Sequence, residues 1–349
     1  MATPPCKVRG LPCFTLASEC RRAHRRIMKT LRLFFLGWLS IFCAFRLTAK
    51  QDESAKIVRA AALNDRGDFR ASILLLEPLL RPEAHGLPRN EAGVALTLLG
   101  NAYQYLGEYR KARQSFEAAI RLLKESPEQA KQYAAALDNL GSLELEEGQA
   151  EPARVLRLKV KRLYEEMGDH MGVARTASNL SLIALQQERY KEARQVLAEA
   201  FHEVGLAPQP NTDDLAAMFA IQGVIAGHDL GARSALKPIQ LAIELWEHRH
   251  GPDYFQLGAA YVIRGQIYDT LGEYQQAKSD LQNALAGIEQ TSGIDSPLYL
   301  RAEIAYAHAL RASGSNEQAL QLEAKAAAAL AQLRFRQCVG CSVSALGLH

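Results

Sequence analysis

Residues 99–119 read LGNAYQYLGEYRKARQSFEAA, and the spacing of their small residues returns along most of the chain. Ala112 follows Gly100 by twelve positions, and Ala119 follows it by nineteen. Equivalents of Gly100 recur every 40 to 42 residues, at Gly141, Ser181, Gly223, Gly265 and Ala307. The second column continues as Ala153, Ala193, Ala235, Ala277 and Ala319, and the third as Val160, Ala200, Ala242, Ala284 and Ala326. Columns at a fixed period of this length predict a helical repeat array.

Helix packing explains these columns. Two antiparallel helices bury a shared face only when their backbones approach closely, and small residues at the crossing permit this approach. A turn with Gly107 near its centre separates the two helices, and equivalent turns lie at residues 147–150, 187–190, 271–274 and 313–316. A glycine there is typical of a left-handed helix cap. Each repeat is therefore predicted to be a helical hairpin.

Prolines mark the joints between repeats. They occur in Ser126-Pro127, Pro208-Gln209-Pro210, Gly251-Pro252 and Ser296-Pro297, where one repeat should end and the next begin. Proline cannot continue a helix interior, so these are natural helix boundaries. No long run of alternating β-branched residues is present. The pattern predicts an all-helical body.

The order Leu99-Gly100-x-x-Tyr103, followed by Gly107, Tyr109, Ala112, Phe116 and Ala119, resembles the tetratricopeptide repeat. Residues 265–284 match nearly as well, and a degenerate first repeat fits around Ala60. The period exceeds the family's usual length of about 34 residues, which resembles the extended variety seen in kinesin light chains and some bacterial regulators. The family's Trp is replaced throughout. The resemblance implies an all-α fold, a right-handed superhelical solenoid of about seven hairpins over residues 50–336, with a concave and a convex face.

The net charge of +3 is unevenly distributed over the 349 residues. Residues 1–49 carry nine Lys and Arg against one acidic residue, whereas residues 50–349 carry 32 basic against 37 acidic residues. A mildly acidic body argues against nucleic acid as a partner, because phosphate binding needs a surplus of Lys and Arg. The ordinary apolar fraction of 48% excludes wholesale disorder.

Residues 28–49 have the pattern of a signal peptide. Lys29 and Arg32 precede an uncharged run over residues 33–45, which is shorter than the about 20 residues that a membrane span requires. We interpret Met28 as the true start, residues 1–27 as upstream sequence, and the body as exported to the periplasm or secreted. The alternative is an uncleaved anchor at residues 33–45 in the inner membrane, which would be the only membrane contact of the chain.

Signatures of catalysis are missing from the sequence. It contains no G-x-S-x-G, no H-E-x-x-H and no phosphate-binding glycine loop, so we predict neither an enzyme nor a cofactor, and no catalytic residue or metal site. Cys338 and Cys341 form a C-x-x-C in the C-terminal tail, residues 337–349. In an exported protein a disulfide between them is plausible, with unpaired thiols or a metal or redox pair as the alternatives.

Two charged clusters are interpreted as solvated surface rather than as functional sites. The segment Glu247-His248-Arg249-His250 with Asp253 contains metal-ligand types, but nothing fixes a third or fourth ligand, so we favour a solvated helix end. The second cluster is a basic run on the second helix of one repeat. We predict that it is a solvated outer face, with a docking patch as the alternative. The run comprises Arg154, Arg157, Lys159, Lys161 and Arg162.

The family resemblance implies that the first helix of each repeat lines the concave face. The peptide-binding residues expected there are Asn101, Gln104, Asn139, Arg175 and Asn179, with Asp138 beside them. Asn can pair with both the donor and the acceptor of an extended peptide, and Arg can bind a carboxylate through two hydrogen bonds. The alternative is that the asparagines only satisfy backbone groups between repeats. The second half of this face is predicted to be apolar, from Ala217, Ala220, Val224 and Val262.

These patterns favour a non-enzymatic interaction scaffold that binds a protein or peptide along its concave face. The alternative function is a membrane-tethered sensory or regulatory protein whose output lies in a partner. Retention of residues 28–49 in the mature protein would favour the tethered form.

Overall fold

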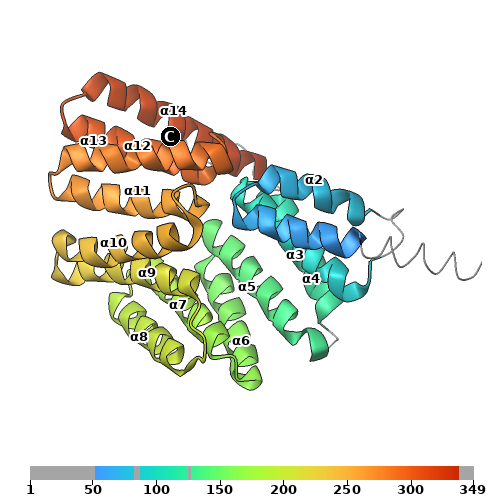
Figure 1. Cartoon of the computed structure of the whole chain (residues 1–349). Helices are drawn as coiled ribbons and strands as arrows, with labels where there is room; N and C mark the ends of the chain where they lie inside the picture. The colour runs from blue at the N-terminus through green and yellow to red at the C-terminus, as the bar shows by residue number, and fades with distance from the viewer. Residues whose placement is uncertain (1–51, 82–86, 125–126, 338–349) are drawn as a thin grey trace, which may run out of the picture. The chain divides into compact units, whose positions relative to one another are not determined.

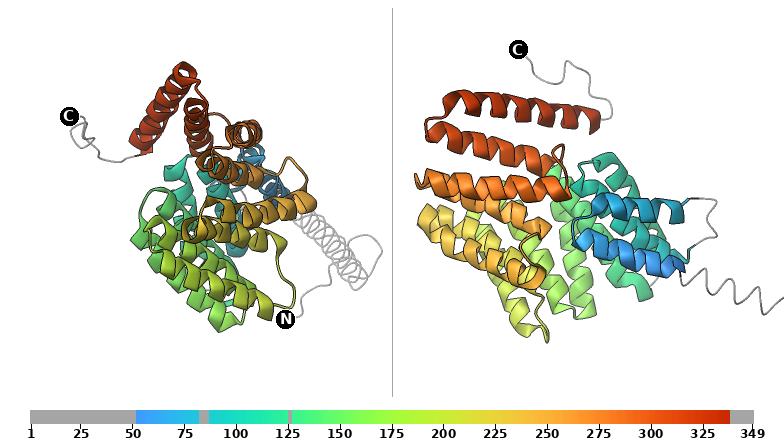
Figure 2. Two further views of the ribbon diagram at one scale, coloured as in Figure 1. Left: turned by 90° about the vertical axis from the view of Figure 1, so that its left-hand side faces the viewer. Right: turned by 45° about the horizontal axis from the view of Figure 1, so that its top comes forward.

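The computed structural model of the chain describes residues 52–81, 87–124 and 127–337, and all regular secondary structure in these ranges is helical. The chain divides into two compact units, residues 1–55 and 56–349. Of the first unit only residues 52–55 are described, and they are helical. Figure 1 and Figure 2 show the helices of the second unit from three directions. No strand occurs among the described residues, which confirms the predicted all-α class.

Helices pair into hairpins in chain order. Residues 56–65 are helical and pack against α2 (Phe69–Leu79). The following pairs are α3 (Arg89–Tyr105) with α4 (Tyr109–Leu123), α5 (Ala130–Glu146) with α6 (Ala150–Met167), α7 (His170–Gln186) with α8 (Tyr190–Leu206), α9 (Thr212–Leu230) with α10 (Ala232–His250), α11 (Phe255–Thr270) with α12 (Tyr274–Thr291), and α13 (Pro297–Ala312) with α14 (Asn316–Gln337). A short 3-10 helix, η1 (Pro127–Gln129), precedes α5. The described residues thus form seven hairpins, as predicted.

The small-residue columns lie where the paired helices cross. No alanine of the second column is more than 1% exposed, and every member of the third column is fully buried. The first column explains why glycine is favoured there. A Cβ at Gly100 would lie 2.5 Å from Phe116, and a Cβ at Gly265 would lie 2.7 Å from Leu281. Because real Cβ atoms do not approach other atoms so closely, the larger side chain of the second helix can fill this space only when the first helix carries a small residue.

The turns within the hairpins share one backbone conformation. Positive φ angles occur at Gly67, Gly107, Gly148, Gly272 and Gly314, and the residue after each donates a hydrogen bond of 2.8 or 2.9 Å to a carbonyl five residues earlier. This confirms the predicted left-handed caps. Glu188 occupies the same place with φ 56°, a conformation that costs a residue with a side chain about 1–2 kcal/mol. Only the α9–α10 turn differs, because α9 continues to Leu230 and Gly231 alone joins the two helices.

Joints between hairpins follow the predicted boundaries. Ser296 caps α13 by accepting a hydrogen bond of 3.3 Å from the Tyr299 N–H, and Pro297 is the first residue of that helix. Three pairs of successive first helices contact one another, α3 with α5, α7 with α9, and α11 with α13. In the described part of the chain, successive second helices have no comparable contact. The first helices therefore lie on the inner side of the stack, because a stack of layers bends toward the side where its members are closer.

One contact joins hairpins that are not neighbours in the stack. The ring of Phe69 on α2 stacks on Tyr105 with centroids 4.5 Å apart, and both meet the edge of Phe255 on α11, at 5.5 and 5.1 Å. Close backbone packing accompanies the rings, since a Cβ at Gly67 would lie 2.8 Å from Thr291 and one at Gly107 would lie 2.8 Å from Pro297. The first two hairpins thus pack against α11 and the ends of α12 and α13, which a linear stack does not do.

Several predictions concern residues outside the described ranges. They include the start at Met28, the signal peptide at residues 28–49, the anchor at residues 33–45 and the cysteine pair Cys338 and Cys341. Export, membrane tethering and the disulfide therefore stay predictions. Within the described ranges, every helix is too short or too polar to cross a bilayer.

Two glycines of one hairpin should respond oppositely to alanine. Gly287→Ala should raise the free energy of unfolding by about 1 kcal/mol, because Gly287 lies in α12 with open space at its Cβ position and alanine is the better helix former. Gly265→Ala should lower it by about 1–3 kcal/mol, because the new methyl group overlaps Leu281. Urea unfolding followed by circular dichroism measures both. Equal effects of the two substitutions would contradict the close-approach account.

Loss of the Phe255 ring should loosen the contact between non-neighbouring hairpins. Phe255→Ala removes the edge-to-face pairs with Phe69 and Tyr105, worth about 1–3 kcal/mol together. Amide hydrogen exchange at residues 66–69 and 105–108 should accelerate. The matched control is Phe219→Ala, which removes a ring pair with Phe201 between adjacent hairpins and should leave those amides unchanged. Unaltered exchange in the Phe255 variant would show that the contact contributes nothing.

Candidate functional site

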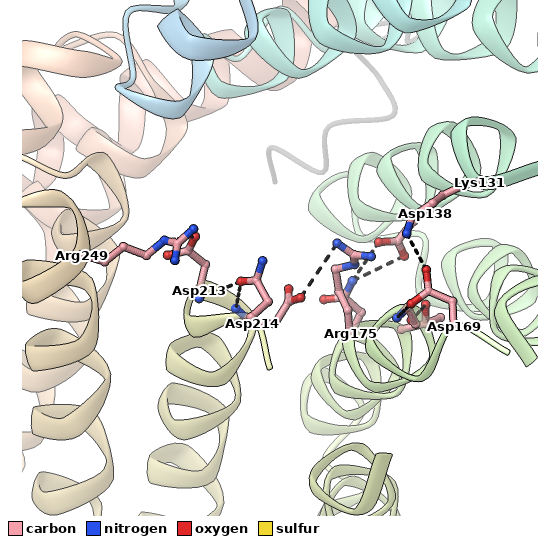
Figure 3. Close-up of polar contacts among 11 residues, drawn as sticks. Lys131, Asp138, Asp169, Arg175, Asp213, Asp214 and Arg249 are labelled. Atoms are coloured by element: carbon pink, nitrogen blue, oxygen red, sulfur yellow. Dashed lines mark hydrogen bonds and ion pairs between the residues drawn. The ribbon is translucent and has the colours of Figure 1, made fainter. Parts of the chain in front are cut away.

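A row of polar side chains crosses the first helices α5, α7 and α9. Asp138 lies on α5, Arg175 and Asn179 lie one turn apart on α7, and Asp214 lies in the first turn of α9. We call these four residues the polar band. Figure 3 shows Arg175 between Asp214 on one side and Asp138 on the other. All four residues lie on first helices, and the second helix α6 contacts two of them, through Arg157 at Asp138 and through Tyr164 at Arg175.

Asp138 and Asn179 are joined by a side-chain hydrogen bond. The Asn179 Nδ2 donates to the Asp138 carboxylate at 3.1 Å from Oδ2 and 3.4 Å from Oδ1. This bond joins α5 to α7, two first helices of successive hairpins. A carboxylate only accepts hydrogen bonds, so the contact fixes the amide nitrogen of Asn179 toward Asp138.

Beneath the band lies Arg157 of α6, and this corrects the prediction that the basic run is solvated. Its side chain is only 3% exposed, with Nε 3.4 Å from Asp138 Oδ1. Nη1 donates to the main-chain carbonyl of Asn179 at 2.8 Å, and Nη2 donates to the Ser142 hydroxyl at 2.8 Å. The side chain reaches so far because Gly141 leaves room for its stem, with the Gly141 Cβ position 3.4 Å from Arg157 Cγ. Burial lowers the pKa of Arg157, and Asp138 opposes that shift.

Two other members of the basic run, Lys159 and Lys161, contact neighbouring side chains. The Lys159 ammonium donates to the Tyr133 hydroxyl at 2.7 Å. Lys161 pairs with Glu199 of the next hairpin at 2.5 Å and with Glu165 at 3.0 Å. The correction therefore concerns Arg157, whereas Lys159 and Arg162 are exposed as predicted.

Arg175 is the most open member of the band. Its side chain is 40% exposed, and its nearest ionic partner is Asp214, whose Oδ2 lies 3.9 Å from Nη1. That distance is too long for a hydrogen bond. The guanidinium also lies over the Tyr164 ring, 5.8 Å from its centroid. Burial raises the pKa of the Asp214 carboxyl, and Arg175 offsets only part of this effect.

The remaining predicted residues lie apart from this cluster. Gln104 on α3 is buried, and its Nε2 donates to Glu146 at 2.8 Å. Asn101 and Asn139 are half-buried, and neither side chain bonds to any residue that the structure describes. The structure thus brings Arg175 and Asn179 together but leaves Asn101, Gln104 and Asn139 separate. The prediction that all five bind a peptide stays untested.

The predicted apolar second half of this face is only partly open. Val224 is 38% exposed and Ala217 is half-buried, but Ala220 and Val262 are buried among neighbouring helices. These two residues are therefore packing residues.

The end of α10 lies at the surface and pairs with side chains of neighbouring helices. Asp213 of the preceding helix accepts from His250 Nε2 at 2.7 Å and lies 3.1 Å from Arg249 Nε. Glu247 accepts from the Tyr261 hydroxyl at 2.7 Å, and the His250 ring stacks on Tyr254. The expectation of a solvated helix end is confirmed for His248, Arg249 and Asp253, which are exposed, and surface contacts with Asp213 and Tyr261 accompany it. Among the described residues, no group of His, Cys, Asp and Glu is arranged to hold a metal ion.

Sequence reasoning missed two contributors to the band. Asp214 precedes the small residue of its repeat by nine positions, outside the positions searched. Arg157 was recognised only as a member of a charged run. Its signal was its column: sixteen residues after Gly141 it takes the place that Phe116 takes after Gly100, where an apolar residue is expected. Together the band offers hydrogen-bond donors, acceptors and one exposed cation to a ligand.

Comparison with known proteins identifies the repeat. Family profiles described as tetratricopeptide repeat match residues 94–126, 132–201 and 258–286. No curated protein sequence matches the chain.

Solved structures of low sequence identity share the fold. The Rap conjugation gene regulator of the plasmid pLS20 in complex with the Phr* peptide has a TM-score of 0.62 at 13% identity, over 84% of this chain and 76% of that one. The apo form of RapI has a TM-score of 0.55 at 14% identity, over 82% and 100%. NprR in complex with its cognate peptide NprX has a TM-score of 0.54 at 18% identity, over 79% of each chain.

Stability should depend on pH through Asp169 at the edge of the band. Asp169 caps α7 by accepting from the Gly172 N–H at 2.9 Å, and it pairs with Lys131 at 2.7 Å. Burial alone would raise the pKa of Asp169, but these two partners outweigh it and hold that pKa below its usual value. A lowered pKa stabilises the fold above the unfolded pKa of about 4, and the contribution is lost as pH falls through the folded value.

Asp169→Asn should therefore cost at most about 1 kcal/mol at neutral pH, and the difference from the wild type should vanish in acid. Urea unfolding at several pH values measures it. The control is Asp253→Asn, at an exposed carboxylate in the α10–α11 joint, which should show no such dependence. A gap that persists at low pH would contradict the ionic origin.

Proposed function

We propose that this chain, a tetratricopeptide-repeat protein, is a non-enzymatic scaffold that binds an extended peptide segment of a partner protein against α5, α7 and α9. The observation that carries the proposal is Arg175. It is a partly exposed guanidinium on the inner side of the stack, its ionic partner lies beyond hydrogen-bond distance, and acidic and amide groups surround it. Such a group binds a carboxylate or a peptide carbonyl with charge-assisted hydrogen bonds.

The arrangement suits a peptide better than a small molecule or a polyanion. The polar band extends across three first helices in succession, which matches an elongated ligand. Asp138 and Asp214 flank Arg175 and disfavour a highly charged anion such as nucleic acid, whereas a single carboxylate or a main-chain carbonyl fits beside them.

Proteins of the same fold supply further support. Both the pLS20 Rap regulator and NprR were solved with a peptide bound. The alternative function, a membrane-tethered sensory protein, depends on residues 28–49, which lie outside the described ranges.

The proposal predicts that Arg175 controls affinity for peptides. Random peptides displayed on phage are selected on the purified full chain, and enriched sequences are synthesised with a fluorescent label. Arg175→Ala should weaken their binding about tenfold or more by fluorescence anisotropy, because it removes charge-assisted hydrogen bonds worth about 1.5–3 kcal/mol.

The matched control is Arg121→Ala, at an exposed arginine of α4, which should bind like the wild type. Failure to enrich any peptide, or equal binding by wild type and the Arg175 variant, would contradict the proposed face.

A further inference from the structure

Arg157 occupies a position that is apolar elsewhere in the inner repeats. Sixteen residues after the small residue, the second helix of the other hairpins carries buried apolar side chains, at Leu76, Phe116, Leu197, Ile239 and Leu281. The last hairpin has Glu323 there, which is half-buried. In the third hairpin the same position holds a guanidinium that is almost entirely removed from water.

Packing alone does not account for an arginine at this position. Burying a guanidinium carries a large desolvation cost, which a leucine would avoid. The bonding of Arg157 is also imperfect, because its buried Nε has no hydrogen-bond partner in the described structure. Its stem fills the space beside Gly141, as Phe116 does beside Gly100, but its charged end continues past α5 to the inner side. The polar contacts of the guanidinium, rather than its packing, therefore explain why an arginine occupies this position.

Those contacts fix two first helices at the polar band. Arg157 lies 3.4 Å from Asp138 on α5 and donates to the main-chain carbonyl of Asn179 on α7. Asp138 in turn accepts from the side-chain amide of Asn179. The chain of contacts runs from a buried cation through a carboxylate to the amide nitrogen of Asn179.

We propose that Arg157 is a positioning residue, which holds Asp138 so that Asn179 keeps its Nδ2 on Asp138 and its Oδ1 free as a hydrogen-bond acceptor for a bound peptide. The inference rests on the proposed function and specifies the ligand's chemistry. With Nδ2 directed to Asp138, the opposite atom of the amide is Oδ1, and no described residue donates to it. The Asn179 Oδ1 is therefore available to accept a hydrogen bond from a ligand.

Arg175 supplies the complementary half of the site. It has only donors, and it precedes Asn179 by four residues, about 6 Å along a helix axis. Alternate residues of an extended chain are separated by about 6.6 Å and present their N–H and C=O groups to the same side. A peptide lying along α7 can therefore place a carbonyl or carboxylate at Arg175 and an N–H group at Asn179. The ligand class is an extended peptide with a free backbone N–H at that point.

The decisive variant is Arg157→Leu, which introduces the residue found at three equivalent positions. Without the guanidinium, Asp138 should no longer be held, and the side-chain amide of Asn179 should lose its fixed orientation. Nitrogen-15 NMR of the full chain reports this as a shifted Asn179 Nδ2 signal with averaged proton resonances, assigned by comparison with Asn179→Asp. Affinity for peptides selected as above should fall about tenfold.

Two further variants keep the proposal testable if the single change unfolds the chain. Arg157→Leu combined with Asp138→Ala removes both charges, a change that buried ion pairs usually tolerate, and should keep the fold while losing the amide orientation and the affinity. Arg154→Leu, one turn away on α6, is the matched control and should change neither readout. Methylation of the backbone N–H of a selected peptide at the contact residue should weaken its binding to the wild type. The same methylation should leave its affinity for Arg157→Leu unchanged.

The two readouts separate this inference from the proposed function. An Asn179 amide signal that keeps its wild-type position in the Arg157 variants would overturn the positioning role, whether or not peptides bind. A displaced amide signal with unchanged affinity for peptides that still need Arg175 would overturn the acceptor role alone. Loss of both confirms it.

Discussion

The close approach of the two helices in each hairpin is the constraint on which the rest of the structure depends. A small residue on the first helix admits a large side chain from the second, and alanines twelve and nineteen positions later complete the crossing. The interface is buried so completely that a single added methyl group at Gly100 or Gly265 would overlap its partner. Because the same contact recurs in each hairpin, it sets both the period of the chain and the stacking of its layers.

The polar band is a local departure from this packing rule. In the third hairpin the side chain that enters the space beside the small residue is Arg157, which is long enough to pass through the helix layer. A charge thereby reaches the inner side from a helix that otherwise contributes only to the core and the outer surface. The fold remains intact because Asp138, Ser142 and a main-chain carbonyl satisfy most of that charge. Binding chemistry and core packing are thus coupled through one side chain.

A second departure concerns the independence of the repeats. In a linear solenoid each layer contacts only its neighbours, so stability is approximately a sum over adjacent pairs. Here Phe69 and Tyr105 of the first two hairpins contact Phe255 of the sixth. This contact adds a long-range term, so a change in α11 affects the first hairpins directly. In the sequence, the helices α5, α7 and α9 that carry the polar band lie between the hairpins that this aromatic contact joins.

The sequence determined the class, the number of hairpins, the glycine turns and the buried columns, because all of these depend on contacts within a hairpin or between adjacent ones. Spacing alone encodes such contacts. Even the non-glycine turn at Glu188 could be located from its repeat position, although not its φ angle. The tertiary structure alone decided that Arg157 points inward, that Asp138 is the partner of Asn179, and that Phe255 meets Phe69. Which side chains meet across layers depends on side-chain length, on the available space and on the rotation accumulated from hairpin to hairpin, and a linear pattern of residues contains none of these directly.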